Sequence, residues 1–299
     1  MAVAVMFPGQ GAQRAGLGEP WRAHPAWSVV ERAEAALDRP VAQLLLDPGA
    51  PLDRTEDAQL AVLLASLLAW EAVGPALGEP VAFAGHSLGQ VTALIATRAL
   101  PFEDGVRLAA RRARHTQEAA ERRPGEMAAL LGATPEQAEE ACSAAPGACW
   151  LANDNAPGQV VVAGTEAGVA ATVERARALG ARRSVPLPVG GAFHTPLMEE
   201  ARSAFAADLE DAPLAPSGLP VVSNGDARAY RDADGWRRRL ADHLVRPVRW
   251  RESVETLVAS GASQLVEVGP GTTLAGLARR IAPGVPVRSV ELPREEVRV

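Results

Sequence analysis

The sequence predicts an α/β protein in which a large domain with a parallel sheet contains an inserted small α+β subdomain. Two observations support this class. Apolar runs of strand length alternate with helical patterns through most of the 299 residues, and this alternation is typical of a parallel sheet covered by helices. Near the middle the order changes to strand, helix, strand, strand, helix, strand. We therefore expect a large domain from residues 1–123 and 191–299, and a small one from residues 124–190.

The first part of the large domain begins with an apolar strand followed by a turn. Residues 3–7 have the composition of a buried strand, and a segment rich in glycine and proline follows at 8–11. The remaining pattern predicts one more strand and several helices: a strand at 81–84, and helices at 27–37, 60–72, 91–100 and onward to about residue 122.

The small domain is expected to start where Arg123-Pro124-Gly125 interrupts the helical pattern. Thr134-Pro135-Glu136-Gln137 has the spacing of a capping box, which predicts a helix start. A second helix is expected at 165–179, and strands at 127–131, 149–152, 159–163 and 183–189. This order is typical of a ferredoxin-like subdomain.

After Gly190-Gly191 the large domain resumes with the same alternation as before. Strands are expected at 221–224 and 265–268, and helices at 197–209, 236–244 and 254–259. The last inner strand turns through Gly269-Pro270-Gly271 into a helix, as strands of parallel sheets do.

Composition excludes several classes of protein. The formal net charge of −6 argues against nucleic acid as a partner, because phosphate binding needs a basic surface. The most apolar stretch, 60–77, contains polar residues, glycine and proline, so we interpret it as a buried helix and not as a membrane span. Two cysteines and a start without a charged leader indicate a cytoplasmic protein.

Gly85-His86-Ser87-Leu88-Gly89 lies between an apolar strand pattern and a helical pattern. This is the context of a nucleophile elbow, so the large domain is expected to be α/β-hydrolase-like. A serine on such a turn projects its hydroxyl above the sheet, and the next amide, that of Leu88, points to where an acyl oxyanion forms. Ser87 is therefore the candidate nucleophile.

A serine hydroxyl needs a base, and the chain has five histidines. His86 is adjacent to Ser87, and neighbours on an elbow point apart, which favours a supporting role. His194 lies in a loop between a predicted strand and a predicted helix, which suits a general base. We therefore expect a Ser87–His194 dyad.

Three motifs occur in a characteristic order: Phe7-Pro8-Gly9-Gln10-Gly11-Ala12-Gln13, Gly85-His86-Ser87-Leu88-Gly89 and Ala192-Phe193-His194-Thr195-Pro196-Leu197-Met198. Together they resemble the malonyl-CoA:acyl carrier protein transacylases of fatty acid and polyketide synthesis, and the likeness spans nearly the whole chain. Further segments agree: Asn153 to Val161, Val222 to Ala227, Arg246 to Trp250 and Glu267 to Gly271.

The resemblance implies Ser87 as nucleophile, His194 as base, and the amides of Gln10 and Leu88 as the oxyanion hole. It places the carboxylate-binding arginine at Arg112, where a planar guanidinium can bind a malonyl carboxylate through two hydrogen bonds. It implies that a backbone carbonyl orients the histidine, at the position of His243. Pocket or supporting positions follow at Gln59, His86, Thr116, Phe193, Asn155 and His243.

The chain departs from the family pattern near the expected pocket. Gln90 replaces a usual glutamate, and His243 stands where relatives carry glutamine or asparagine. Ala113, His115 and Thr116 replace a more typical glycine, apolar residue and methionine. These departures leave the acyl unit open, although the motif around His194 is closer to the malonyl type than to the methylmalonyl type.

The resemblance implies transfer of a malonyl group from coenzyme A to the phosphopantetheine thiol of an acyl carrier protein, through a seryl ester, without a metal or bound cofactor. An acidic carrier predicts a basic patch, with Arg182-Arg183 or the segment from Arg246 to Arg249 as candidates. Two alternatives remain. An editing thioesterase would use the same dyad with water, and an interaction domain would use neither residue.

Overall fold

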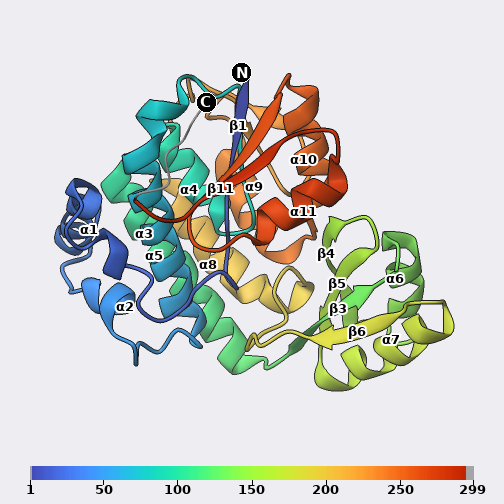
Figure 1. The fold of residues 1–299 in the computed structure, drawn as a ribbon. Coiled ribbons are helices and arrows are strands. Elements are labelled where there is room, and N and C mark those ends of the chain that lie inside the picture. Colours follow the sequence, from blue (N-terminus) through green and yellow to red (C-terminus); the bar gives the residue numbers. More distant parts are fainter. Residues whose placement is uncertain (1, 294–299) are drawn as a thin grey trace.

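The computed structural model describes residues 2–293 and contains two sheets, each covered by helices (Figure 1). The larger sheet has six strands, and each adjacent pair is parallel except the antiparallel pair of β7 and β8. In spatial order the strands are β11 (Val287–Val290), β10 (Gln264–Val268), β1 (Val3–Phe7), β2 (Ala82–Gly85), β7 (Val221–Val222) and β8 (Ala229–Tyr230).

Strand β1 is the centre of the core, and helices cover both of its faces. Val3, Val5 and Phe7 face one apolar cluster, whereas Ala4 and Met6 face another. This alternation explains why the strand is apolar at every position. The helices are α1 (Ser28–Leu37), α2 (Ala42–Leu46), α3 (Thr55–Val73), α4 (Gly89–Ala96), α5 (Phe102–Arg122), α8 (Glu199–Glu210) and α9 (Trp236–Asp242) toward the first cluster, and α10 (Trp250–Ala259) and α11 (Thr273–Ile281) toward the second.

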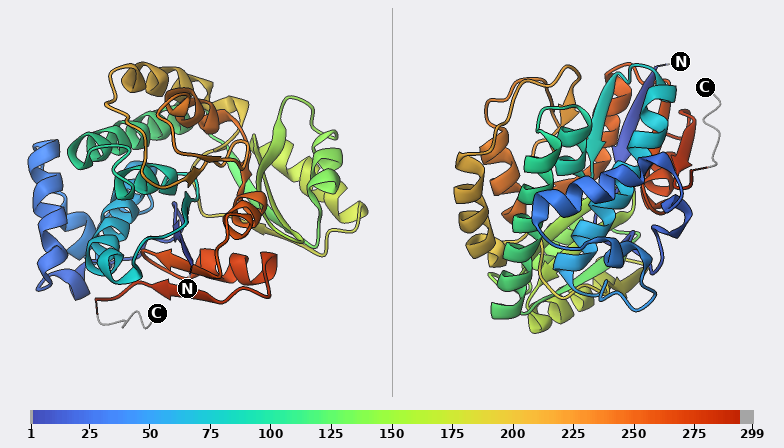
Figure 2. Two further views of the ribbon diagram at one scale, coloured as in Figure 1. Left: turned by 90° about the horizontal axis from the view of Figure 1, so that it is seen from above. Right: turned by 90° about the vertical axis from the view of Figure 1, so that its left-hand side faces the viewer.

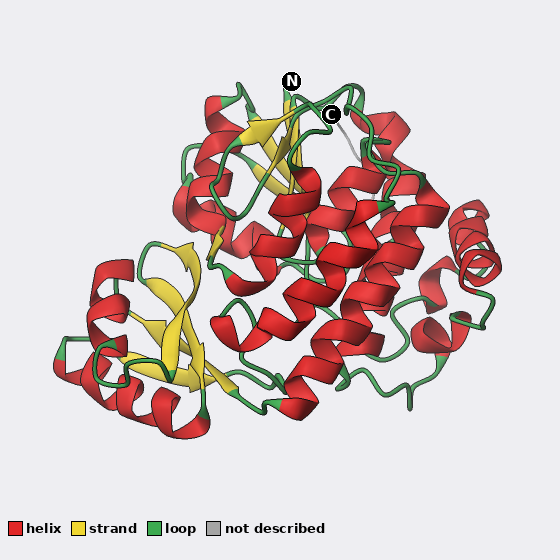
Figure 3. Cartoon of the chain, turned by 180° about the vertical axis from the view of Figure 1, so that it is seen from behind, coloured by secondary structure: helices red, strands yellow, loops and turns green. Residues whose placement is uncertain are grey.

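Helix α3 accounts for the apolar stretch noted in the sequence. Among the described residues, the span Thr55–Leu77 is the one helical segment long and apolar enough to cross a membrane, and 72% of its most apolar window is buried inside the protein. The helix packs against α1 and α5, so its apolar surface faces protein on most sides. Seen from behind, a layer of helices covers the large sheet (Figure 3). Short 3₁₀ turns occur at Glu19–Trp21, Pro25–Trp27, Gly74–Leu77, Pro196–Met198 (η4) and His243–Val245 (η5).

The smaller sheet lies beside the large one (Figure 2) and has five strands. Their order is β6 (Arg183–Pro186), β3 (Glu126–Leu131), β5 (Gln159–Gly164), β4 (Cys149–Ala156) and β9 (Val248–Arg249), with helices α6 (Pro135–Cys142) and α7 (Glu166–Ala178). The predicted capping box is confirmed: the Thr134 hydroxyl accepts from the Gln137 amide, and the Gln137 side chain accepts from the Thr134 amide.

The small sheet differs from the expectation in one respect. Its fifth strand, β9, comes from the C-terminal part of the chain and pairs in parallel with β4, whereas every other pair in this sheet is antiparallel. Two residues are too short a run for a periodic pattern, so β9 could not be predicted from its residues. Strands β8 and β11 were also not predicted.

Three predicted elements are clearly shorter than expected, and one of them is the strand predicted at 221–224, which ends at Val222. The helix predicted at 91–100 ends at Ala96, because the Thr97 hydroxyl donates to the Ala93 carbonyl and Arg98 adopts a left-handed φ of 59°. The strand predicted at 183–189 ends at Pro186, where prolines lack the N–H that a ladder needs.

Candidate active site

The elbow around Ser87 is held by close backbone packing. Ser87 has a left-handed φ of 52°, and its amide donates to Asn224 Oδ1 at 2.8 Å. A Cβ on Gly85 would lie 1.9 Å from the Gly89 carbonyl carbon, and one on Gly89 would lie 2.3 Å from the Phe7 oxygen. Both flanking glycines are therefore required for the turn to form against β1.

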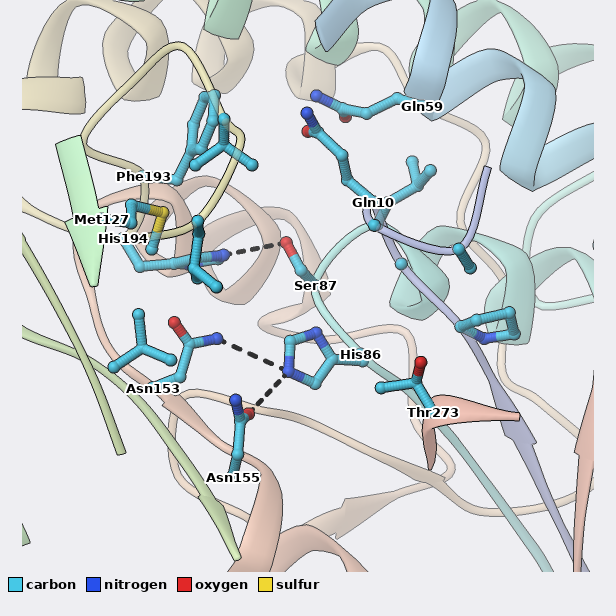
Figure 4. Close-up of a pocket in the computed structure, with 18 of the residues that line it drawn as sticks. Gln10, Gln59, His86, Ser87, Met127, Asn153, Asn155, Phe193, His194 and Thr273 are labelled. Atoms are coloured by element: carbon cyan, nitrogen blue, oxygen red, sulfur yellow. Dashed lines mark hydrogen bonds between the residues drawn. The ribbon is translucent and has the colours of Figure 1, made fainter. Parts of the chain in front are cut away.

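His194 lies within hydrogen-bond distance of Ser87. The distance from His194 Nε2 to Ser87 Oγ is 2.9 Å (Figure 4), and His194 Nδ1 is 2.9 Å from the His243 carbonyl oxygen. Because a carbonyl can only accept, Nδ1 carries the proton and Nε2 is free to accept the serine hydroxyl proton. His194 itself has a left-handed φ of 63° in the loop before η4.

The imidazole of His194 is kept neutral at physiological pH. Burial, and then the positive charge of Arg112, lower its pKa to about 3, although the bond to the His243 carbonyl opposes this shift. Only 6% of the His194 surface is exposed. The His194 imidazole is therefore neutral and can accept a proton.

The turns after β1 and β2 lie side by side at one edge of the large sheet. Phe7 is paired with Gly85, and the His86 amide donates to the Phe7 carbonyl at 2.9 Å. The amides of Gln10 and Leu88 follow these positions, and in residues 2–293 neither donates to another protein group. Two unpaired amides from residues that line the same cavity can bind an oxyanion.

Arg112 lies on α5 and projects its guanidinium to Ser87. Nη2 is 3.0 Å from Ser87 Oγ, and Nη1 donates to Gln59 Oε1. Only 5% of Arg112 is exposed, and burial lowers its pKa to about 10, so it keeps its charge at neutral pH. No acidic group of the described chain contributes to that shift. A buried guanidinium without a carboxylate partner is suited to bind an anionic group.

Gln59 and Thr116 fix the position of this guanidinium. Gln59 Nε2 donates to Thr116 Oγ1 at 2.9 Å, which turns the Gln59 oxygen toward Arg112. The Thr116 hydroxyl in turn lies 2.9 Å from the Ala113 carbonyl. The expectation that His115 lies near the pocket is wrong. Its Nε2 is 2.7 Å from Asp208 Oδ2, because successive residues of a helix are turned by about 100° and His115 therefore faces away from Thr116.

His86 points away from Ser87 toward the small sheet, as Figure 4 shows. Its Nε2 lies 3.0 Å from Asn155 Oδ1 and 3.5 Å from Asn153 Nδ2. Burial lowers the pKa of His86, and the bond to Asn155 raises it by less. The ladder of β4 shifts register just before Asn153 and again at Asn155, and such bulges re-aim side chains. His86 thus links the elbow to β4.

These residues surround one cavity of about 480 Å³, a volume in the range of small-molecule sites. Met127, Ala129 and Val161 of the small sheet form an apolar wall, and α11 contributes Leu274 and Leu277. His243 lies behind His194 and does not line the cavity. The predicted residues that do line it are Gln10, Gln59, His86, Ser87, Leu88, Arg112, Thr116, Asn155, Phe193 and His194.

Sequence reasoning did not assign roles to three residues of this site. Asn224 holds the Ser87 amide, Asn153 contacts His86, and Gln90 bonds His243. Asn224 and Asn153 lay in segments that resemble the family, which was the available signal. The predicted basic segments do not line the cavity: Arg246 pairs with Asp242 and Arg249 with Glu252.

Comparison with known proteins agrees with this geometry. The chain matches the family model described as acyl transferase domain over residues 5–283. It is 35% identical over 285 residues to the malonyl CoA-acyl carrier protein transacylase of Bacillus subtilis, covering 93% of this chain and 90% of the relative. The corresponding protein of Salmonella typhimurium is 37% identical over 286 residues, covering 93% and 92%.

Solved structures give the same result. The malonyl CoA-acyl carrier protein transacylase of Coxiella burnetii matches with a TM-score of 0.93 at 32% identity, over 98% of this chain and 95% of that one. A malonyl-transacylase solved in complex with its type II PKS acyl-carrier protein also matches with a TM-score of 0.93, at 33% identity over 98% and 96%. The chain therefore belongs to the malonyl-CoA:acyl carrier protein transacylase family.

Proposed function

We propose that this protein transfers a malonyl group from malonyl-CoA to the phosphopantetheine thiol of an acyl carrier protein. One observation supports this above all others: the buried guanidinium of Arg112, without an acidic partner in the described chain, lies 3.0 Å from the Ser87 hydroxyl. A carboxylate on the acyl group is the partner that this charge lacks. Family membership and the relative solved with a carrier protein support the same function.

In the first half-reaction, His194 Nε2 removes the proton of Ser87 as Oγ attacks the thioester carbon. The carbonyl oxygen becomes an oxyanion that accepts hydrogen bonds from the amides of Gln10 and Leu88. The C–S bond then breaks, the coenzyme A thiolate takes the proton from His194, and malonyl-Ser87 remains. The His243 carbonyl stabilises the intermediate imidazolium through Nδ1–H.

In the second half-reaction the carrier thiol enters the same cavity. His194 Nε2 takes the thiol proton while sulfur attacks the seryl ester carbon, and the same two amides hold the oxyanion. The C–O bond to Ser87 breaks, and His194 returns the proton to Oγ. Atoms and protons balance over both steps, and every proton transfer is made by protein and substrate groups.

Arg112 gives selectivity for the acyl group. A guanidinium binds a carboxylate through two parallel hydrogen bonds, and the Gln59–Thr116 pair holds it in place for this. An acetyl or alkyl group would leave the charge buried without a partner, which disfavours its binding. The same argument disfavours an editing thioesterase for alkyl chains.

We further propose that residues 1–123 and 191–299 form an α/β-hydrolase-like domain, and that residues 124–190 form a ferredoxin-like subdomain. The strand order β6-β3-β5-β4, with antiparallel neighbours, supports the second description. The buried helix α3 and the cysteine content support a cytoplasmic location. Arg182-Arg183 and Arg246 are exposed and remain the candidate contacts for an acidic carrier.

Intact-mass measurement tests the proposal directly. Brief incubation with malonyl-CoA is expected to add one malonyl group, and Ser87→Ala is expected to abolish the adduct. Addition of a phosphopantetheinylated carrier protein should then move the malonyl group to the carrier. Release of free malonate in place of transfer would identify a hydrolase, and an unchanged adduct in Ser87→Ala would overturn the mechanism.

A further inference from the structure

A closed ring of hydrogen bonds runs behind the dyad. The Ser87 amide donates to Asn224 Oδ1, and the Asn224 amide donates to Gln90 Oε1, each at 2.8 Å. Gln90 Nε2 is 2.8 Å from His243 Nδ1, and the His243 carbonyl is 2.9 Å from His194 Nδ1. The contact between His194 Nε2 and Ser87 Oγ closes the ring.

The direction of each bond in the ring is fixed. The Asn224 backbone amide can only donate, so Gln90 Oε1 is the acceptor and Gln90 Nε2 faces His243 as a donor. His243 Nδ1 must therefore lack a proton, and Nε2 must carry it. Gln90 and His243 are each 2% exposed and Asn224 is 0% exposed, so bulk water has little access to these bonds.

We propose that Gln90 is a positioning residue for malonyl transfer, whose carboxamide holds His243 in its neutral Nε2–H form and fixes the carbonyl that orients His194. This inference rests on the proposed function. One carboxamide joins the nucleophile, through Asn224, to the carbonyl that orients the base, through His243. A shift of Gln90 would therefore change the alignment of both members of the dyad.

The neutral form of His243 matters because its ring lies 4.6 Å from that of His194. His194 becomes positively charged during both half-reactions, and a second charge at this distance would oppose that step. Burial lowers the pKa of His243, and His194, Arg112 and His86 lower it further. The nearby carboxylate of Asp242 is engaged by Arg202 and Arg246 on the outside of η5, at 3.6 Å from each.

The bond from Gln90 adds a second reason for this neutrality. A proton on His243 Nδ1 would place two donors against each other at 2.8 Å. His243 Nε2 has no hydrogen-bond partner among the described residues. Among residues 2–293, the hydrogen bond from Gln90 is therefore the one side-chain hydrogen bond that determines which nitrogen of His243 carries the proton.

Gln90→Glu and Gln90→Leu test the proposal, with Thr92→Val as the control. Glutamate has the same shape but offers only acceptors when ionised, so His243 Nδ1 must take up a proton. Leucine removes both contacts of the side chain. Thr92 lies on the same helix, is buried, and has a hydroxyl without a partner in residues 2–293, so its replacement leaves the ring intact.

The rate of Ser87 malonylation is measured against pH, and the protonated nitrogen of His243 is identified from ¹⁵N chemical shifts. Gln90→Leu is expected to lower the rate about tenfold to hundredfold, equivalent to one buried hydrogen bond. Gln90→Glu is expected to move the His243 proton to Nδ1 and to add an ionisation near the ordinary histidine value of about 6.5 to the rate profile. Thr92→Val should match the wild type in both measurements.

Gln90→Glu could lower the rate while the pH dependence of the rate stays as in the wild type and the His243 proton stays on Nε2. This result would show a merely structural role for Gln90 and would overturn the inference. So would wild-type rates in both Gln90 variants. Wild-type protein that accepts no malonyl group would instead overturn the proposed function. Thermal unfolding of each variant verifies that the compared proteins are folded.

Discussion

The large sheet contributes turns to the cavity, whereas the small sheet contributes strand faces. Gln10 and Ser87 lie directly beyond the carboxyl ends of β1 and β2, where amides are left without ladder partners. Met127 and Val161 instead lie within paired strands and present side chains only. The comparison teaches that the ends of the parallel strands present Ser87 and unpaired backbone amides to the cavity, whereas the antiparallel face determines the shape of the pocket.

Backbone conformation follows the same division. In residues 2–123 and 191–293, left-handed φ angles occur at non-glycine residues, including Ser87 and His194. Between residues 124 and 190, positive φ angles occur only at glycines, as in Gly132 and Gly158. Strain of this kind persists where surrounding contacts impose it. We therefore expect substitutions in the two regions to differ, with catalysis affected in one and stability in the other.

The largest effect is expected from His194→Gln. Glutamine keeps a polar side chain but cannot accept and return a proton, so the rate of Ser87 malonylation should fall by about 10²-fold to 10⁴-fold. Stopped-flow detection of released coenzyme A measures this rate. Unchanged binding of coenzyme A would verify that the cavity is intact, and a loss below about tenfold would mean that another group acts as base.

Arg112→Gln should have the next largest effect, and only on charged acyl groups. We expect kcat/KM for malonyl-CoA to fall about a hundredfold or more, because the carboxylate loses a buried charged partner. The value for acetyl-CoA should stay constant or rise. Arg112→Lys is the matched control: it keeps the charge but loses the planar fork, so it should restore only part of the malonyl activity. Equal losses for both thioesters would contradict this assignment.

The pH dependence tests the surroundings of Ser87 in a different way. Because the pKa of His194 is lowered to about 3, its base form predominates from acidic to neutral pH. The acid limb of kcat/KM should therefore lie well below the ordinary histidine value of about 6.5. Arg112→Gln removes one cause of the lowering, so the limb should move to higher pH. A wild-type limb near 6.5 would show that His194 is more solvated than the structure indicates.

The same histidines affect stability. Burial lowers the pKa values of His86, His194 and His243, so the unfolded chain binds more protons than the folded one below about pH 6.5. Stability from these groups is present above that pH and is lost as the pH falls. Urea unfolding at several pH values measures the trend, and a free energy of unfolding that is constant from neutral to acidic pH would contradict it.

In the small sheet, Met127→Ala should affect stability more than chemistry. Met127 is buried in the wall of the cavity, and its truncation should lower the free energy of unfolding by about 2 kcal/mol or more. The change in kcat should stay within about threefold, since no reacting atom is moved. A hundredfold loss of kcat would show that the small sheet has a part in the reaction itself.

The smallest effect is expected far from the cavity, at Thr134→Ala. Loss of the capping box should lower the free energy of unfolding by about 1 kcal/mol. Activity at a temperature where both proteins are folded should not change. Urea unfolding and the malonylation rate measure the two quantities, and a changed rate would contradict the separation of the two regions.

Much of this architecture could be predicted because it is local. The elbow glycines, the capping box and the buried run of β1 each leave a signal within a few residues. The ring through Gln90, Asn224 and His243 leaves no such signal, since its members are separated by many residues along the chain and meet only through the fold. The pairing of β9 with β4 is likewise a long-range contact made by only two residues.

Strand β9 also limits how the cavity can open. It directly follows η5, its Val248 pairs with Asn153 of β4, and its Arg249 amide donates to the Asn224 carbonyl at 3.0 Å. A hinge motion that swung the small sheet outward would break this pairing and pull on the segment that carries His243. We therefore expect the two sheets to keep their relative position while substrates bind and leave.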